Sequence, residues 1–291
     1  MDIAGLTKHL ERRGTNSVKW DTCGPDELPL WVADMDFAPP PCVRESIIKR
    51  LEHPALGYTF APRSWEDAVR SWCDARQGWT PAGLVPLQGV MAGLHGSILV
   101  STKPGDSVLI QPPVYHPFAS IPPRLNRRVA ESPLRVRTGQ SVAPDGQRPV
   151  RMDWDWESLD TQFADPSVTA MILCSPHNPG GLIWDRHDLV RLGDLARQHG
   201  VTLIVDEIHA DIVRQEGRFV SMGALVAEKA WGEAVPDIIV IQAPTKAFNM
   251  AGISSAWACA SNPELLHRLD QCVRNLGTEV INVLSYVAAE A

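Results

Sequence analysis

The sequence lacks the short motifs that mark the commonest nucleotide-binding and zinc-dependent enzymes. It contains no Walker A lysine motif, no G-x-G-x-x-G fingerprint and no H-E-x-x-H pair. No apolar run reaches the roughly 18 residues that a membrane span needs. No internal repeat recurs at a period of roughly 20 to 50 residues, which argues against a solenoid or propeller. A P-loop enzyme, a zincin and a helical repeat are therefore excluded as interpretations.

An excess of positive charge is also missing. The 27 lysines and arginines are outnumbered by 34 aspartates and glutamates, so the net charge is −7. This balance argues against nucleic acid or an anionic membrane as the main partner. The six cysteines form no C-x-x-C pair, and the N-terminus lacks the apolar stretch of a signal peptide. We therefore expect reduced thiols and a cytoplasmic protein.

What the sequence has is an alternation of apolar runs with helical patterns. An apolar share of 44% over 291 residues is enough for a sizeable core. Short β-rich runs bounded by turn residues are typical of strands buried in a parallel sheet. The alternation predicts a doubly wound, mostly parallel α/β sheet with helices on both faces. The expected strands are 107–111, 127–134, 168–174, 201–205, 237–242 and 254–260; the expected helices include 64–78, with Ser64 as its N-cap, 89–103 and 185–200.

Two segments do not follow this alternation. The first 45 or so residues look irregular, and WVADMDFAPPPCV, with three consecutive prolines, cannot be a helix interior. We expect an arm laid over a neighbouring surface, in which Trp31, Asp34 and Asp36 either line the mouth of a binding site or simply pack. Segment 136–150 is polar and rich in turn residues, and we expect a surface loop or hairpin there.

Chemically distinctive side chains follow the ends of several predicted strands. Ligands of open α/β sheets bind outside the carboxyl ends of the strands, so these side chains are expected to meet at one edge. They are an aromatic ring, an amide, a carboxylate with a nearby imidazole, and an amine: Tyr115, Asn178, Asp206 with His209, and Lys246.

This set of groups matches the needs of one cofactor. A lysine amine forms a Schiff base with an aldehyde, and a carboxylate keeps a pyridine nitrogen protonated. An aromatic ring can stack on a flat ring, and an amide can donate to a phenolate oxygen. The helix that opens at 89–93 would offer free backbone N–H groups to a phosphate. These residues therefore point to pyridoxal 5′-phosphate.

The motifs SPHNPGG, VDEIHAD and APTKAFNMAG, in this order, resemble the aspartate aminotransferase superfamily, which has fold type I. The runs LPLWVADMDF, GYTF and PPVYHPF make the chain similar to the cystathionine β-lyase and cysteine desulfhydrase branch of class I/II aminotransferases. Nearly the whole chain takes part in this resemblance. It departs from the usual pattern around the lysine, where the run is Pro244-Thr245-Lys246-Ala247.

The resemblance implies a role for each matching residue. Lys246 would form the Schiff base and Asp206 would pair with the pyridine nitrogen. Asn178 would bond the ring oxygen, with His209 near it, and Tyr115 would stack. The remaining expected contacts go to the phosphate: the backbone N–H groups of Val90 and Met91, the Thr245 hydroxyl, and Tyr58 reaching from the partner subunit of a homodimer.

The resemblance also implies a domain plan. We expect an arm and part of a small domain at 1–45, a large cofactor-binding domain at 46–275, and the start of a connecting helix at 276–291. In the family, a C-terminal small domain carries the arginine that grips the substrate carboxylate, and no residue of this chain can be assigned that role. We therefore expect either a fragment or a natural truncation.

The implied reaction is α,β-elimination on a sulfur amino acid such as cystathionine or cysteine, giving a thiol, pyruvate and ammonia. Transamination is the alternative within the same family. A truncated, non-catalytic protein that serves as an interaction partner is the alternative outside enzymes.

Two other patterns have simpler interpretations. The acidic and imidazole groups of DEIHAD could suggest a metal site, but alternate residues after a strand point apart. Glu207 is then interpreted as a structural carboxylate. Cys174 with His177 could suggest a thiol catalyst, and a buried strand-end cysteine is the favoured interpretation.

Overall fold

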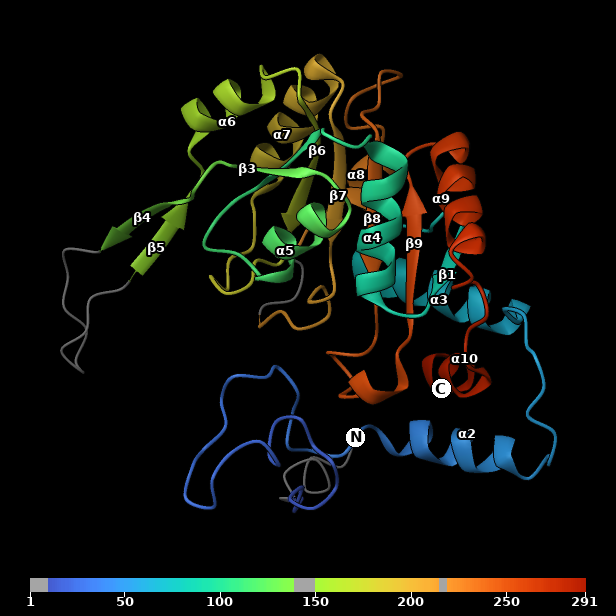
Figure 1. Ribbon diagram of the computed structural model, residues 1–291. Coiled ribbons are helices and arrows are strands. Elements are labelled where there is room, and N and C mark those ends of the chain that lie inside the picture. Colours follow the sequence, from blue (N-terminus) through green and yellow to red (C-terminus); the bar gives the residue numbers. More distant parts are fainter. Residues whose placement is uncertain (1–9, 139–149, 215–218) are drawn as a thin grey trace.

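The protein is described by a computed structural model that covers residues 10–138, 150–214 and 219–291. Its centre is a seven-stranded sheet with the order β1-β9-β8-β7-β6-β2-β3 (Figure 1). In chain order the strands are β1 (Val85–Leu87), β2 (Ser107–Ile110), β3 (Arg128–Glu131), β6 (Val168–Cys174), β7 (Thr202–Asp206), β8 (Ile238–Gln242) and β9 (Ala256–Ala260).

The sheet is mostly parallel, as the alternation predicted. Strands β3, β2, β6, β7 and β8 pair in parallel. The expected run 254–260 forms β9, but β9 pairs antiparallel with β8, and the unpredicted β1 pairs antiparallel with β9. Only 13 residues, 243–255, connect β8 to β9, and the 3₁₀ turn η1 (Ala251–Ile253) is the one helical element among them, so the chain turns back directly. Since β1 reverses the direction again, it runs the same way as β8.

Two helical layers cover the sheet. On one face lie α4 (Val90–Ser101), α5 (Pro117–Arg124) and α9 (Pro263–Asn275); on the other lie α3 (Arg63–Gln77), α6 (Trp156–Phe163), α7 (Arg186–His199) and α8 (Met222–Ala227). Strand residues alternate between the two cores. Leu203 and Val205 of β7 pack with the α3 side, whereas Ile204 packs with the α4 side.

The remaining elements lie at the periphery. Strands β4 (Arg135–Thr138) and β5 (Val150–Asp153) form the antiparallel pair expected around 136–150, while 139–149 lie outside the described residues. Helix α10 (Val283–Glu290) packs on α2 (Pro41–Leu51) and α3, with the Tyr286 ring edge-on to Trp65 at 5.4 Å. Helix α3 begins at Arg63, so Ser64 is not its N-cap; its hydroxyl bonds Glu290 instead.

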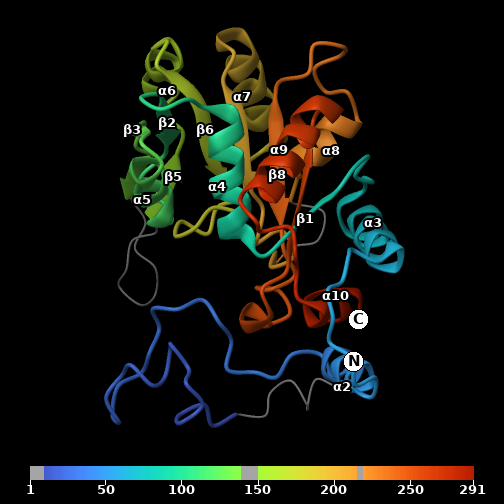
Figure 2. The same ribbon diagram turned by 45° about the vertical axis from the view of Figure 1, so that its right-hand side comes forward.

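The N-terminal arm has no regular secondary structure between residue 10 and α2. Figure 2 shows that it passes below the end of the sheet at which β6, β7 and β8 finish. The 3₁₀ turn η1 (Ala251–Ile253) follows β8 on this same side. In the described residues, no helix is long and apolar enough to cross a membrane.

Candidate active site

The parallel strands bring the expected side chains to one edge of the sheet. Asp206 ends β7 and is in register with Cys174 at the end of β6 and with Ile241 near the end of β8. Asn178 therefore follows one neighbour of Asp206, and Lys246 follows the other. The sequence predicted this convergence correctly because parallel strands share the direction of their carboxyl ends.

Asp206 is a buried carboxylate with few partners. Only 3% of the residue is exposed, and one oxygen accepts a hydrogen bond from the Ile208 N–H at 3.1 Å. Within the described part of the chain, it forms no ion pair at contact distance. Burial raises the pKa of Asp206 to about 6, against the opposing effects of the Ile208 N–H and the positive charge of Lys246. A cation placed against this carboxylate would offset the cost of its burial.

Lys246 lies on the turn that follows β8, half-buried. Its Nζ donates a hydrogen bond of 3.0 Å to the carbonyl oxygen of Ala33 in the N-terminal arm. Its charge also acts on two neighbours from the β7 end. It lowers the pKa of Asp206, and after burial it is the next cause that lowers the pKa of His209. The positive charge of the amine is therefore close enough to Asp206 and His209 to change the pKa of both.

Tyr115 and Asn178 flank Asp206 from the other side. Burial raises the pKa of Tyr115, and the negative charge of Asp206 raises it further, which places the phenol near that carboxylate. The ring packs edge-on against Phe118 at 5.9 Å. The Asn178 backbone N–H donates to Cys174 Sγ at 3.3 Å, which ties the residue to the end of β6. Cys174 is buried and burial raises its pKa to about 12, so it is not a reactive thiolate.

The N-terminus of α4 reaches the same edge because it directly follows β1. Gly89 precedes the helix with φ +149°, a conformation that favours glycine. The first helical hydrogen bond runs from the Gly93 N–H to the Gly89 carbonyl. The N–H groups of Val90 and Met91 thus have no partner inside the helix and can receive an anion. Thr245 is nine-tenths buried beside Lys246.

Tyr58 is the expected residue that does not lie at this edge. It belongs to the segment between α2 and α3, and 97% of it is exposed. Its neighbour Phe60 is 87% exposed. A tyrosine that contacts the phosphate site of its own chain would lie at this edge. The contact of Tyr58 with the phosphate site of a partner subunit stays a prediction.

Glu207 follows Asp206 directly but has quite different surroundings. Its carboxylate accepts hydrogen bonds from Ser221 Oγ at 2.7 Å, the Met222 N–H at 2.8 Å and Gln242 Nε2 at 2.7 Å. It therefore joins the start of α8 to the end of β8, which agrees with a structural carboxylate. Among residues 10–138, 150–214 and 219–291, no group of three or more metal-ligating side chains could hold an ion.

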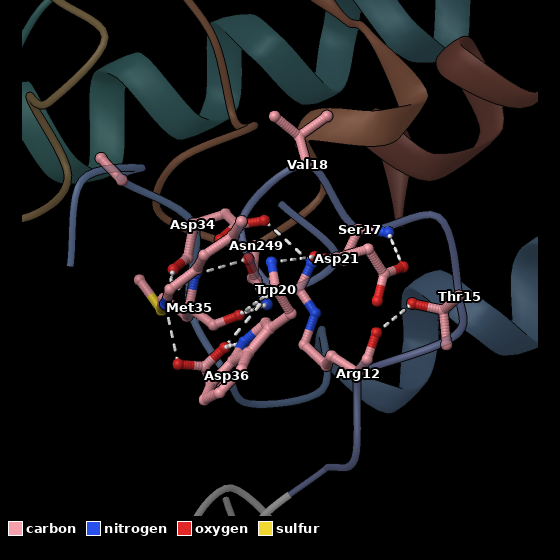
Figure 3. A network of polar contacts seen from close by, with 12 residues as sticks. Arg12, Thr15, Ser17, Val18, Trp20, Asp21, Asp34, Met35, Asp36 and Asn249 are labelled. Atoms are coloured by element: carbon pink, nitrogen blue, oxygen red, sulfur yellow. Dashed lines mark hydrogen bonds and ion pairs between the residues drawn. The ribbon is translucent and has the colours of Figure 1, made fainter. Parts of the chain in front are cut away.

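Sequence reasoning missed Asn249, and it left open whether Asp34 and Asp36 of the arm line the site or pack. Asp34 and Asp36 pair with Arg12 and Lys19 within the arm, so they pack rather than point at the site (Figure 3). The Asn249 amide bonds the main chain of the arm. Its one sequence signal was a position in the APTKAFNMAG motif, three residues after Lys246.

A seven-stranded mixed sheet with this edge defines the large domain of a fold type I pyridoxal phosphate enzyme. The family model for aminotransferase class I and II matches residues 25–291, and the chain belongs to this family. Its sequence lies in the carbon–sulfur lyase branch. It is 36% identical over 292 residues to cystathionine beta-lyase PatB of Bacillus subtilis, covering 98% of this chain and 71% of that protein.

Solved structures agree with this placement. Cystalysin from Treponema denticola, which contains a pyridoxal 5′-phosphate cofactor, matches with a TM-score of 0.85 at 27% identity, covering 98% of this chain and 71% of that one. The pyridoxal-phosphate-bound C-S lyase from Staphylococcus hominis matches with a TM-score of 0.82 at 28% identity, covering 97% and 68%. The chain thus spans about two thirds of the length of such relatives.

Proposed function

We propose that this chain binds pyridoxal 5′-phosphate at the sheet edge and provides the cofactor machinery of a carbon–sulfur β-lyase acting on cystathionine or cysteine. The observation that carries the proposal is that the buried Asp206 carboxylate, with one hydrogen-bond donor, and the Lys246 amine follow adjacent strand ends, close enough for the amine to lower the pKa of the carboxyl group. The similarity to a cystathionine beta-lyase over almost the whole chain supports the choice of reaction.

The described residues fit the cofactor. Asp206 has a single hydrogen-bond donor and no ion pair in the described part of the chain, so a pyridinium N–H would satisfy it. The unpaired N–H groups of Val90 and Met91 suit a phosphate, with the Thr245 hydroxyl as a further donor. Tyr115 would stack on the ring. Asn178 and His209 would face the ring oxygen.

When bound, pyridoxal phosphate supplies an electron sink for negative charge at the substrate Cα. Lys246 would hold the cofactor through its aldehyde, and its amine would be the general base that removes the Cα proton of the substrate. Asp206 would keep the pyridine nitrogen protonated. The overall reaction would consume the sulfur amino acid and water and would give a thiol, pyruvate and ammonia.

The test is incubation of the purified chain, alone and fused to the remaining third of a cystathionine beta-lyase, with pyridoxal phosphate and then with cystathionine or cysteine. Visible absorbance reports cofactor binding, and lactate dehydrogenase coupling reports pyruvate. Transfer of the amino group to an added keto acid, without thiol release, would instead make the protein an aminotransferase. A chain that folds but never binds the cofactor would leave a non-catalytic role, and the proposal would be wrong.

A further inference from the structure

The side chain of Asn249 holds the N-terminal arm by its main chain. Asn249 Oδ1 accepts a hydrogen bond from the Met35 N–H at 2.9 Å, and its Nδ2 donates to the Met35 carbonyl at 2.9 Å (Figure 3). The same Nδ2 donates to the Phe37 carbonyl at 2.6 Å. One amide thus satisfies both polar groups of Met35, much as a neighbouring β-strand would. The bonds join parts of the chain that lie more than 210 residues apart.

Asn249 and Lys246 belong to one tight turn. The Asn249 N–H donates to the Lys246 carbonyl at 3.4 Å, and the Met250 N–H donates to the Thr245 carbonyl at 3.0 Å. Lys246 itself donates from Nζ to the Ala33 carbonyl. The turn therefore contacts the arm at Ala33 through the lysine and at Met35 through the asparagine. Movement of the arm would change what surrounds the lysine amine.

Ion pairs hold the acidic side chains of the arm. Asp34 accepts from Arg12 at 2.9 Å, and Asp36 accepts from Lys19 at 2.7 Å. Trp20 Nε1 also donates to Asp36 at 2.6 Å. Lys19 is only 5% exposed, which shields its end of the pair from water, whereas the Asp36 side chain is 30% exposed. Side chains thus fix Asp34 and Asp36. At Met35 between them, Asn249 bonds both main-chain groups, and the carbonyl also accepts a hydrogen bond from Arg12 at 3.0 Å.

We propose that Asn249 is a positioning residue for Lys246. It fastens residues 33–37 against the turn that carries the lysine, so that the Ala33 carbonyl stays beside the amine and the arm forms a wall of the site. The effect on Lys246 chemistry rests on the proposed function. The fastening of the arm does not, and it can be measured without any cofactor.

The conformation of Asn249 permits a clean substitution. Its φ is +50°, which glycine adopts without strain, so Asn249→Gly removes the amide and spares the backbone. Asn249→Asp retains the acceptor for Met35 but replaces both donations by repulsion between oxygens. Asn126→Gly is the matched control, since Asn126 has φ +60°, lies exposed after α5, and its side chain bonds no described residue.

Hydrogen exchange of the cofactor-free chain tests the fastening. We expect the amides of residues 33–37 to exchange roughly tenfold faster or more in Asn249→Gly, as loss of about three hydrogen bonds implies. The amides of β7 should keep their protection, and Asn126→Gly should match the parent throughout. Loss of protection throughout the chain in Asn249→Gly would mean that this variant is destabilised as a whole. Asn249→Asp is then compared with the parent, and its residues 33–37 should lose protection while β7 keeps it.

A second measurement tests the positioning. The rate at which borohydride-trapped pyridoxal phosphate accumulates on Lys246 should fall several-fold in Asn249→Gly and stay unchanged in Asn126→Gly. Unchanged exchange at 33–37 in both Asn249 variants would overturn the proposal. Faster exchange with an unchanged trapping rate would overturn the link to Lys246. No trapping in the parent would contradict the proposed function instead, and the exchange result would still decide whether Asn249 holds the arm.

Discussion

Asp206 and Glu207 are adjacent in the chain, but their buried carboxyl groups face opposite sides of the sheet. Asp206 acts on the pKa of Tyr115 and Cys174, on the α4 side. Glu207 acts on the pKa of Cys73 and Cys259, on the α3 side. The alternation of a strand thus separates two carboxylates that the sequence presents as a pair. In the described residues the Asp206 carboxylate accepts one hydrogen bond, whereas the Glu207 carboxylate accepts three.

Lys246 is expected to be the residue that pyridoxal phosphate modifies. After reduction with borohydride, peptide mapping should find the cofactor on Lys246, because its amine lies beside Asp206 at the strand ends. Lys246→Ala should abolish both the label and the visible absorbance. Lys103→Ala, a change at an exposed lysine at the far end of α4, should alter neither. A label that maps to another lysine would remove Lys246 from the proposed role.

Asp206→Asn should damage chemistry far more than cofactor retention. The phosphate and ring contacts remain, but the pyridine nitrogen loses its charged partner and its pKa falls. The electron sink weakens, and a rate loss of roughly 10²-fold is expected at about 1.4 kcal/mol per decade. Single-turnover absorbance changes with a sulfur amino acid measure this loss in the fusion with the remaining third of a cystathionine beta-lyase, with and without the substitution. Equal rates in the variant and the parent would show that Asp206 does not pair with the ring.

Glu207 should make the stability of the fold depend on pH. Burial raises its pKa to about 7 from 4.5, so the native state holds this proton more tightly than the unfolded chain does. Its contribution to the free energy of unfolding therefore falls as the pH rises from about 4.5 to 7, by roughly 2 to 4 kcal/mol.

Glu207→Gln isolates this contribution. The variant should be less stable than the parent at pH 5, by about 1 to 3 kcal/mol, because one oxygen of the carboxyl group is replaced by an NH2 group, which cannot accept a hydrogen bond from the donors around it. Its deficit should shrink towards pH 8, since only the parent has a carboxyl group to ionise. Urea unfolding at the two pH values measures the difference. A deficit that grows with pH would reverse the assigned direction of the pKa shift.

Tyr58→Phe should weaken cofactor binding if two chains share their sites. Removal of one hydroxyl from a phosphate contact is expected to cost roughly tenfold in affinity or more. Phe60→Leu, a change at the neighbouring exposed ring, is the matched control. Absorbance titration gives the affinities, and light scattering shows whether the chain is dimeric. A monomer that binds the cofactor equally well with either residue would exclude the shared site.

The chain by itself should release little or no pyruvate, and the remaining third of a relative should restore the activity. The described residues supply a cofactor shell, but none is assigned to the substrate carboxylate. A charge-assisted arginine contact would fix orientation as well as affinity, so its absence should lower kcat as well as raise KM. Pyruvate release from cystathionine is to be compared between this chain and a fusion with the rest of a cystathionine beta-lyase.

The same fusion carrying Lys246→Ala is the control for contaminating activity. Robust pyruvate production by the 291-residue chain alone would mean that a residue within it holds the carboxylate. The account of substrate binding would then be wrong.

The sequence by itself determined the strands of the main sheet other than β1, and the edge at which the site lies. Runs such as 168–174 and 201–205 are mostly apolar because both faces of the strand are buried. This local property of the sequence predicts a buried strand without knowledge of the fold. Each of these strands is followed within four residues by a residue of the expected site: Asn178 after 168–174, Asp206 after 201–205 and Lys246 after 237–242. Parallel strands end on the same side, so adjacency in the chain was enough to predict that these residues share one edge.

Only the tertiary structure decided which distant groups meet. The antiparallel entry of β9, the three donors around Glu207 and the bond from Lys246 to Ala33 each depend on elements that pack together after folding. The hydrogen bonds from the Asn249 side chain to the N-terminal arm are the clearest case. The amide bonds main-chain atoms more than 210 residues away, and main-chain atoms are the same whatever residue carries them. A hydrogen bond to backbone atoms imposes no pattern on the amino-acid sequence, so it is found only in the tertiary structure.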